Sequence, residues 1–120
     1  MFSHIFVGVS DFERALTFYT PLMAALGIAP RFCDRALPWA GWQSSPGPRP
    51  LFLIGAPHDK LAHAPGNGQM SAFLADSRAR VDQAYAVALA HGGRCGGCTA
   101  RCRVRLRAAG GNRDRLGGCR

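Results

Sequence analysis

A strand, a helix cap, a helix and a terminal glycine occur twice in this chain. Shifting the sequence by 66 residues places Arg14 on Arg80, Gly27 on Gly93 and His4 on Met70. In both halves a short strand-like segment precedes a helix of about four turns that ends at glycine. Repetition of one structural unit indicates two similar modules that share a core. The repeat also predicts that a second set of strands follows residue 93.

The first module begins with a strand and a helix. Residues 2–9 alternate, with Ile5, Val7 and Val9 on one face and His4, Phe6 and Gly8 on the other, which is typical of a strand with two distinct faces. The run Ser10-Asp11-Phe12-Glu13 fits a capping box with Ser10 as the N-cap. Apolar residues then recur at helical spacing, and we expect Pro21 to disturb the helix and Gly27 to end it.

Shorter elements follow. Residues 31–33 and 38–42 together predict a second strand, and residues 51–54 predict a short apolar strand. Residues 58–68 are predicted to be a loop, on which His58 and His63 would be surface residues. Residues 70–75 predict another strand, and Ser77 is a plausible N-cap for a helix that ends at Gly92 and Gly93.

The last 27 residues differ from the rest in composition. Residues 94–120 hold eight Arg, six Gly and four of the five Cys, whereas residues 1–93 carry seven basic and six acidic residues. The net charge of +8 therefore lies mainly in this tail, and nucleic acid could bind there only non-specifically, through phosphates. The segment 103–107 alternates and is compatible with an edge strand. Otherwise the composition predicts a tail that is disordered or that follows a frameshift.

Compartment and membrane association can also be judged from the sequence. No run of 18 apolar residues exists and the N-terminus lacks a basic region followed by an apolar core, so neither a membrane span nor a secretory signal is expected. The protein is expected to be cytoplasmic, where a disulfide framework is unusual.

Two groups of motifs resemble a known family. The first is Ser3-His4-Ile5-Phe6-Val7-Gly8-Val9-Ser10-Asp11 with Arg14-Ala15-Leu16-Thr17-Phe18-Tyr19 and Leu26-Gly27. The second is Gly66-Asn67-Gly68-Gln69-Met70-Ser71-Ala72-Phe73 with Arg80-Val81-Asp82 and Ala90-His91-Gly92-Gly93. Both resemble the vicinal-oxygen-chelate superfamily of glyoxalases, bleomycin resistance proteins and dioxygenases, and most of all the bacterial lactoylglutathione-lyase-like proteins.

The resemblance implies a fold and a domain organisation. The fold is α+β, with a βαβββ module, an incomplete second module, and a cup-shaped mixed sheet with its helices outside. The domain spans residues 1–93, with the first module at 1–57, the loop at 58–68 and the start of the second module at 69–93. The tail at 94–120 lies outside the resemblance.

The resemblance also implies a metal site. Members of the superfamily often hold a divalent metal such as Zn, Ni, Fe or Mn at the floor of the cup, with one ligand from the first strand of each module. His4 occupies the first ligand position. Met70 occupies the second, but a thioether is a poor ligand for such an ion. No catalytic residue can be assigned from these motifs.

Three interpretations of the protein's role remain open. The first is a metal-dependent lyase or isomerase acting on a small oxygenated substrate, such as a glutathione hemithioacetal. The second is a metal-free small-molecule binding protein of the bleomycin-resistance type, and the third is an inactive truncated product.

A substrate pocket would be lined by five apolar residues, although the two Trp and two Phe could equally belong to the core: Phe6, Trp39, Trp42, Phe52 and Met70. A homodimer is expected, because an unfinished module leaves a bare strand edge.

Overall fold

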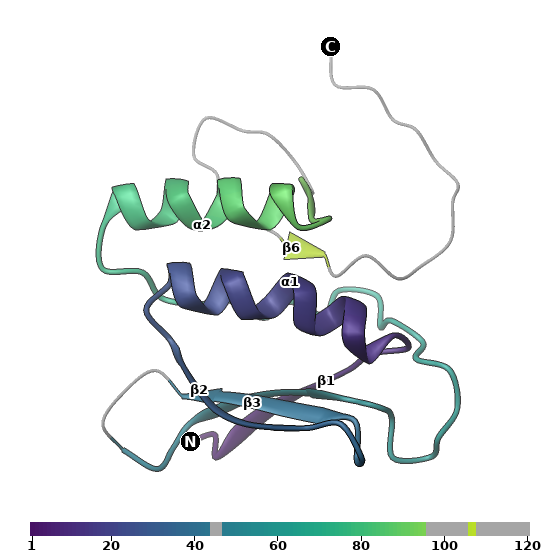
Figure 1. Ribbon diagram of the computed structural model, residues 1–120. Coiled ribbons are helices and arrows are strands. Elements are labelled where there is room, and N and C mark those ends of the chain that lie inside the picture. Colours follow the sequence, from purple (N-terminus) through teal and green to yellow (C-terminus); the bar gives the residue numbers. More distant parts are fainter. Residues whose placement is uncertain (44–46, 96–105, 108–120) are drawn as a thin grey trace.

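A four-stranded mixed sheet carries two helices on one side (Figure 1). The computed structural model describes residues 1–43, 47–95 and 106–107. The order of elements is β1 (His4–Gly8), α1 (Phe12–Ala25), β2 (Ala29–Asp34), β3 (Trp39–Gln43), β4 (Leu51–Gly55), α2 (Arg78–Ala90), β5 (Arg94–Cys95) and β6 (Leu106–Arg107). The first five elements form the βαβββ module that the motifs imply.

The sheet has the spatial order β1-β4-β3-β2. β1 runs parallel to β4, while β3 is antiparallel to both β4 and β2. The segment expected to be one strand over residues 31–42 is therefore two strands. A turn separates them, in which Oδ1 of Asp34 accepts hydrogen bonds from the backbone N–H groups of Ala36 (2.8 Å) and Leu37 (3.2 Å). A carboxylate that binds the backbone two residues ahead is a common device for reversing the chain.

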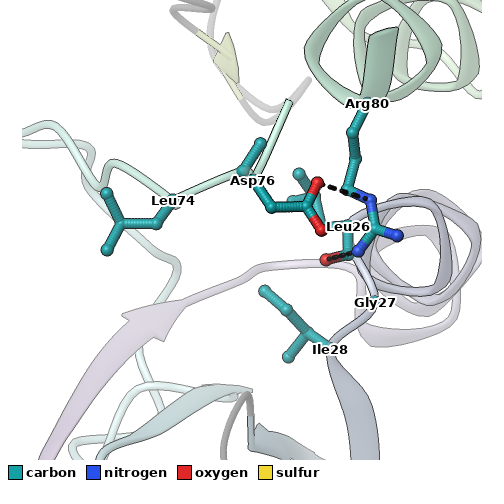
Figure 2. A pocket seen from close by; sticks show the side chains of 7 residues that line it. Leu26, Gly27, Ile28, Leu74, Asp76 and Arg80 are labelled. Carbon is teal, nitrogen blue, oxygen red and sulfur yellow. Dashed lines mark hydrogen bonds and ion pairs between the residues drawn. The ribbon is translucent and has the colours of Figure 1, made fainter. Parts of the chain in front are cut away.

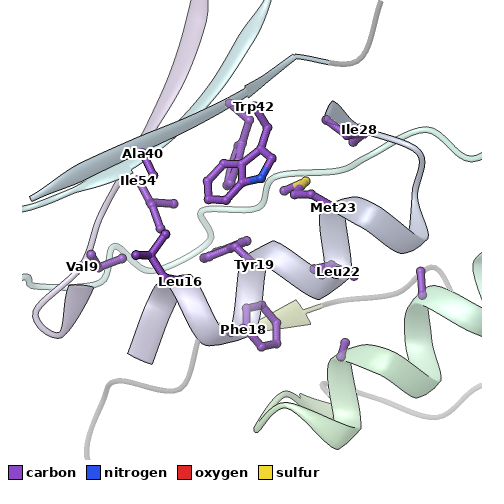
Figure 3. Packing of buried hydrophobic residues seen from close by; sticks show 13 residues of the cluster. Val9, Leu16, Phe18, Tyr19, Leu22, Met23, Ile28, Ala40, Trp42 and Ile54 are labelled. Carbon is purple, nitrogen blue, oxygen red and sulfur yellow. The ribbon is translucent and has the colours of Figure 1, made fainter. Parts of the chain in front are cut away.

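Helix α1 lies between the sheet and α2 (Figure 1). Leu16, Tyr19 and Met23 belong to the buried cluster that includes Trp42 and Ile54 of the sheet (Figure 3). Phe18 is also buried. A Cβ built on Gly93, just beyond α2, would come within 3.0 Å of its ring. Because α1 is covered on two sides, a single apolar stripe does not describe it.

Small residues allow α2 to pack closely on α1. Ala84 and Ala88 are the buried residues of α2, with 4% and 0% of their surface exposed. Leu89, next to Ala88, is 42% exposed. Helices that meet through alanine can bring their backbones close together, since the distance between two helix axes depends on the side chains at the contact.

Both helices end in the same way. At the end of α1 the N–H of Gly27 binds the carbonyl of Ala24 (3.0 Å) and the N–H of Ile28 binds that of Met23 (2.8 Å). At the end of α2, Gly92 and Gly93 make the equivalent bonds to Leu89 and Ala88. Gly27 and Gly92 have φ of 74° and 92°, the left-handed conformation that this C-terminal motif requires. The prediction that glycine ends each helix is confirmed.

The N-terminal caps agree with the sequence only in part. Ser77 caps α2 as predicted, its side chain accepting from the N–H of Arg80. The N-cap of α1 is Asp11, not Ser10, and its carboxylate accepts from the N–H of Arg14 at 3.0 Å. The two caps are thus 66 residues apart, in register with the repeat. Pro21 lies inside α1, which continues to Ala25.

The strand expected at residues 70–75 does not form. Residues 69–75 are irregular, and Met70 and Leu74 are 63% and 95% exposed. A strand needs a partner to bind its backbone N–H and C=O groups, and no strand of the described part of the chain pairs with this segment. β5 pairs instead with β6, which lies within the segment predicted as an edge strand. Most of the tail, 96–105 and 108–120, lies outside the described residues, so the expectation of disorder or a frameshift stays a prediction.

Candidate functional site

The surface of the sheet that faces away from α1 is a candidate binding face. Strand alternation in β1 places Val7 on the helix side, where it packs against the core. His4, Phe6 and Gly8 therefore lie on the opposite side, and Phe6 is 45% exposed. We call this surface of β1, β4, β3 and β2 the open face.

Three aromatic side chains from different strands lie on the open face. The ring centroids of Phe32 and Trp39 are 4.5 Å apart. A Cβ built on Gly55 would meet the Cβ of Trp39 at 3.0 Å and the ring of Phe6 at 3.2 Å, so Phe6 and Trp39 flank this glycine. Trp39 is 42% exposed. Exposed aromatic rings gathered on one surface are the usual lining of sites for small apolar molecules.

Trp42 and Phe52 do not belong to this face, which corrects two of the five predicted pocket residues. Trp42 pairs with Phe52 across β3 and β4, and both side chains point towards α1, with 3% and 7% of their surface exposed. Their ring centroids lie 6.3 Å and 5.2 Å from that of Tyr19. Burial raises the pKa of the Tyr19 hydroxyl. Trp39 and Trp42 are an odd number of residues apart in one strand, so they face opposite sides.

Met70 does not lie on a strand of the sheet. The residue lies on the irregular segment that follows the loop and is mostly exposed. Its predicted position at the second ligand site depended on a strand at residues 70–75, which is absent from the described structure. The structure therefore does not place Met70 opposite His4 in the way that the repeat suggests.

His4 lies on the open face, but its surroundings do not fit a three-ligand metal centre. The side chain is exposed, and its Nδ1 lies 2.8 Å from Oγ of Ser3. Across residues 1–43 and 47–95 no group of three or more His, Cys, Asp or Glu side chains is close enough to hold a metal ion. The described residues thus supply His4 alone to the predicted site.

His63 is a residue of the open face that the sequence did not reveal. Its backbone N–H donates a hydrogen bond to Oγ of Ser10 at 3.1 Å, which brings the loop back to the end of β1. A Cβ built on Gly8 would lie 3.0 Å from Nδ1 of His63. His63 is thus a surface residue, as expected for this loop, but it is half-buried against the sheet. The contact joins residues 53 positions apart, and no local pattern signals it.

A separate pocket of about 410 Å³ lies between the end of α1 and the segment before α2. Figure 2 shows Arg80 pointing into it, with its Nε 3.2 Å from Oδ1 of Asp76 and one terminal nitrogen 3.3 Å from the carbonyl oxygen of Leu26. The guanidinium is thus already bound by two acceptors. We interpret this pocket as part of the contact between the two modules.

No helix in the described part of the chain is both long and apolar enough to cross a membrane.

No protein-family model matches the sequence, and no curated protein does. A solved structure is similar, that of a glyoxalase/bleomycin resistance protein from Albidiferax ferrireducens T118. The similarity covers 78% of this chain and 71% of that chain, at 34% sequence identity and a TM-score of 0.67. On this evidence, together with the βαβββ module, the chain belongs to the glyoxalase/bleomycin resistance proteins of the vicinal-oxygen-chelate superfamily.

Proposed function

We propose that this protein binds a small, planar, largely apolar molecule on the open face without the help of a metal ion. The observation that carries the proposal is the pair of exposed aromatic residues, Phe6 and Trp39, on either side of Gly55. A flat ring resting on both side chains would displace water from two aromatic surfaces at once. Because Gly55 has no side chain, Phe6 and Trp39 can close over the backbone and lie side by side.

A metal-dependent lyase or isomerase is the second candidate, supported by His4 on the open face. The described residues do not fit the metal centre that this activity needs, since they bring no group of three or more His, Cys, Asp or Glu side chains together. We therefore derive no reaction step through a metal. If a divalent ion does take part, its other ligands come from a second chain or from outside the described residues.

Titration with 2-naphthoate tests the proposed binding function. We expect the indole N–H signal of Trp39 to shift in NMR spectra, with the same affinity in buffer containing a chelator. Trp39→Leu should weaken the affinity about five- to tenfold, as expected for loss of an aromatic contact worth about 1 kcal/mol. Leu89→Ala is a matched control, because Leu89 is also 42% exposed but lies on α2.

The result that contradicts metal-free binding is an affinity that falls in chelator and returns with added Zn, Ni, Fe or Mn. If that dependence disappears in His4→Ala, the metal-dependent candidate takes precedence. If the wild-type protein shows no change at Trp39 in either buffer, the binding proposal fails and an inactive product becomes the better interpretation.

We also propose that the protein forms a homodimer. β1 is at one edge of the described sheet, and two apolar side chains near that edge are exposed, Phe2 at 74% and Ile5 at 41%. An edge strand flanked by exposed apolar residues is a common site of chain pairing. Light scattering coupled to size-exclusion chromatography should give the mass of two chains, and an Ile5→Lys variant should give the mass of one.

A further inference from the structure

The loop that follows β4 brings a histidine onto the open face. Residues 56–68 leave the sheet and return to it at His63, whose N–H binds Oγ of Ser10 at 3.1 Å. Ser10 is free to accept this bond because Asp11 caps α1 in its place. The local geometry at the start of α1 thus fixes where the loop docks.

The imidazole ring of His63 is not needed for this docking. The backbone N–H of residue 63 makes the anchoring bond, and any residue other than proline would supply that donor. Among residues 1–43 and 47–95, nothing forms a hydrogen bond with the imidazole nitrogens of His63. A half-buried polar ring with unused hydrogen-bonding capacity is available to a ligand.

The ring lies beside the exposed aromatic side chains of the open face. His63 packs over Gly8, and Gly8 pairs with Gly55 across β1 and β4. Phe6 and Trp39 stand around Gly55. Since Gly8 and Gly55 lie on neighbouring strands about 4.8 Å apart, a planar ligand that rests on the exposed rings of Phe6 and Trp39 would have its edge near His63.

We propose that His63 is the polar contact that selects the ligand of this site, and that it recognises planar molecules carrying an acceptor oxygen, such as a carboxylate or a carbonyl, at one edge. An imidazole always carries at least one N–H donor, whether neutral or protonated. Burying such an oxygen against the sheet without a donor would oppose binding. The proposal rests on the proposed binding function and specifies its substrate class.

Two ligands of similar shape test the role of His63 in the intact protein. 2-Naphthoate has the acceptor oxygens, and naphthalene lacks them. We expect His63→Ala to weaken the affinity for 2-naphthoate about tenfold, the loss typical of one hydrogen bond to a charged group. The affinity for naphthalene should stay the same. His63→Gln, which keeps a side-chain donor, should recover part of the loss.

His58→Ala is the matched control, because His58 lies on the same loop but is exposed. This variant should bind both ligands as the wild type does. Hydrogen exchange at the amide of residue 63 should be unchanged in His63→Ala, since the bond to Ser10 remains. That result would separate loss of the ring from loss of the loop conformation.

Two outcomes overturn the role of His63. In the first, His63→Ala binds 2-naphthoate as tightly as the wild type. In the second, it loses affinity for both ligands equally, which indicates a structural role only. Both differ from failure of the proposed function itself, in which neither ligand shifts the Trp39 signal of the wild-type protein and the role of His63 falls with it.

Discussion

Arg80 in the first turn of α2 donates a hydrogen bond of 3.3 Å to the carbonyl oxygen of Leu26, the C-cap residue of α1. The two residues are 54 positions apart. The bond satisfies one of the carbonyl groups that the end of a helix leaves free, and it places a positive charge at the negative end of the helix dipole. Arg80 therefore joins the start of α2 to the end of α1.

Replacing Arg80 should destabilise the protein more than replacing its neighbour Arg78. Arg80→Ala removes the bond to Leu26 and the ion pair with Asp76, and we expect the free energy of unfolding to fall by about 1–2 kcal/mol. Arg78 pairs with Asp82 at 3.9 Å, and both side chains are more than 70% exposed. Arg78→Ala should therefore change the free energy of unfolding by less than about 0.5 kcal/mol. Denaturant unfolding monitored by circular dichroism measures both, and equal effects would contradict the role given to Arg80.

Glycine 27 and glycine 92 allow the strain of a left-handed residue to be separated from a steric clash. Both have positive φ, so alanine at either position should cost about 1 kcal/mol. A Cβ on Gly27 would also lie 2.5 Å from a terminal nitrogen of Arg80, whereas nothing lies within 4 Å of one on Gly92. Gly27→Ala should therefore be the more destabilising change, by about 1 kcal/mol, because Arg80 must leave Leu26.

A double-mutant cycle checks this explanation. In the Arg80→Ala background the two glycine substitutions should have equal effects, since the clash and the hydrogen bond are both gone. If Gly27→Ala remains the more harmful change in that background, the difference comes from the backbone alone and not from Arg80.

The caps of α1 predict different consequences for two adjacent residues. Asp11→Ala removes the acceptor for the N–H of Arg14 and should lower the free energy of unfolding by about 1 kcal/mol. Ser10→Ala removes the acceptor for the N–H of His63 and should speed hydrogen exchange at that amide, with a smaller effect on α1. Faster exchange throughout α1 in Ser10→Ala would instead support Ser10 as the N-cap.

Tyr19 should make the protein less stable in alkaline solution. Burial raises its pKa above the usual 10.0, so the folded state holds the phenol proton more tightly than the unfolded state does. Its contribution to stability is complete below pH 10 and is lost as the pH rises through the folded-state pKa. Between pH 9 and pH 11.5 the free energy of unfolding should fall less steeply with pH for Tyr19→Phe than for the wild type. Parallel curves would show that Tyr19 ionises equally in both states.

The sequence alone determined the elements that depend on contacts between near neighbours. The first strand, the cap at Ser77 and the glycines that end both helices all appear where the pattern predicts them. Each depends on residues within a few positions of one another, so the physical cause is present in the local sequence. The βαβββ order was implied by the family motifs, and the structure confirms it.

Only the tertiary structure decided which side chains share a surface. Trp39 and Trp42 are equally good pocket residues by type, and the pairing of Trp42 with Phe52 under Tyr19 sends one to the core and leaves the other on the open face. Residues 70–75 have strand-like composition but no strand pairs with them among the described residues, so they stay irregular. His63 reaches Gly8 because a loop folds back over a long separation in sequence. Strand pairing, strand register and the docking of a loop all join distant parts of the chain. The local sequence does not specify which distant residues will be in contact.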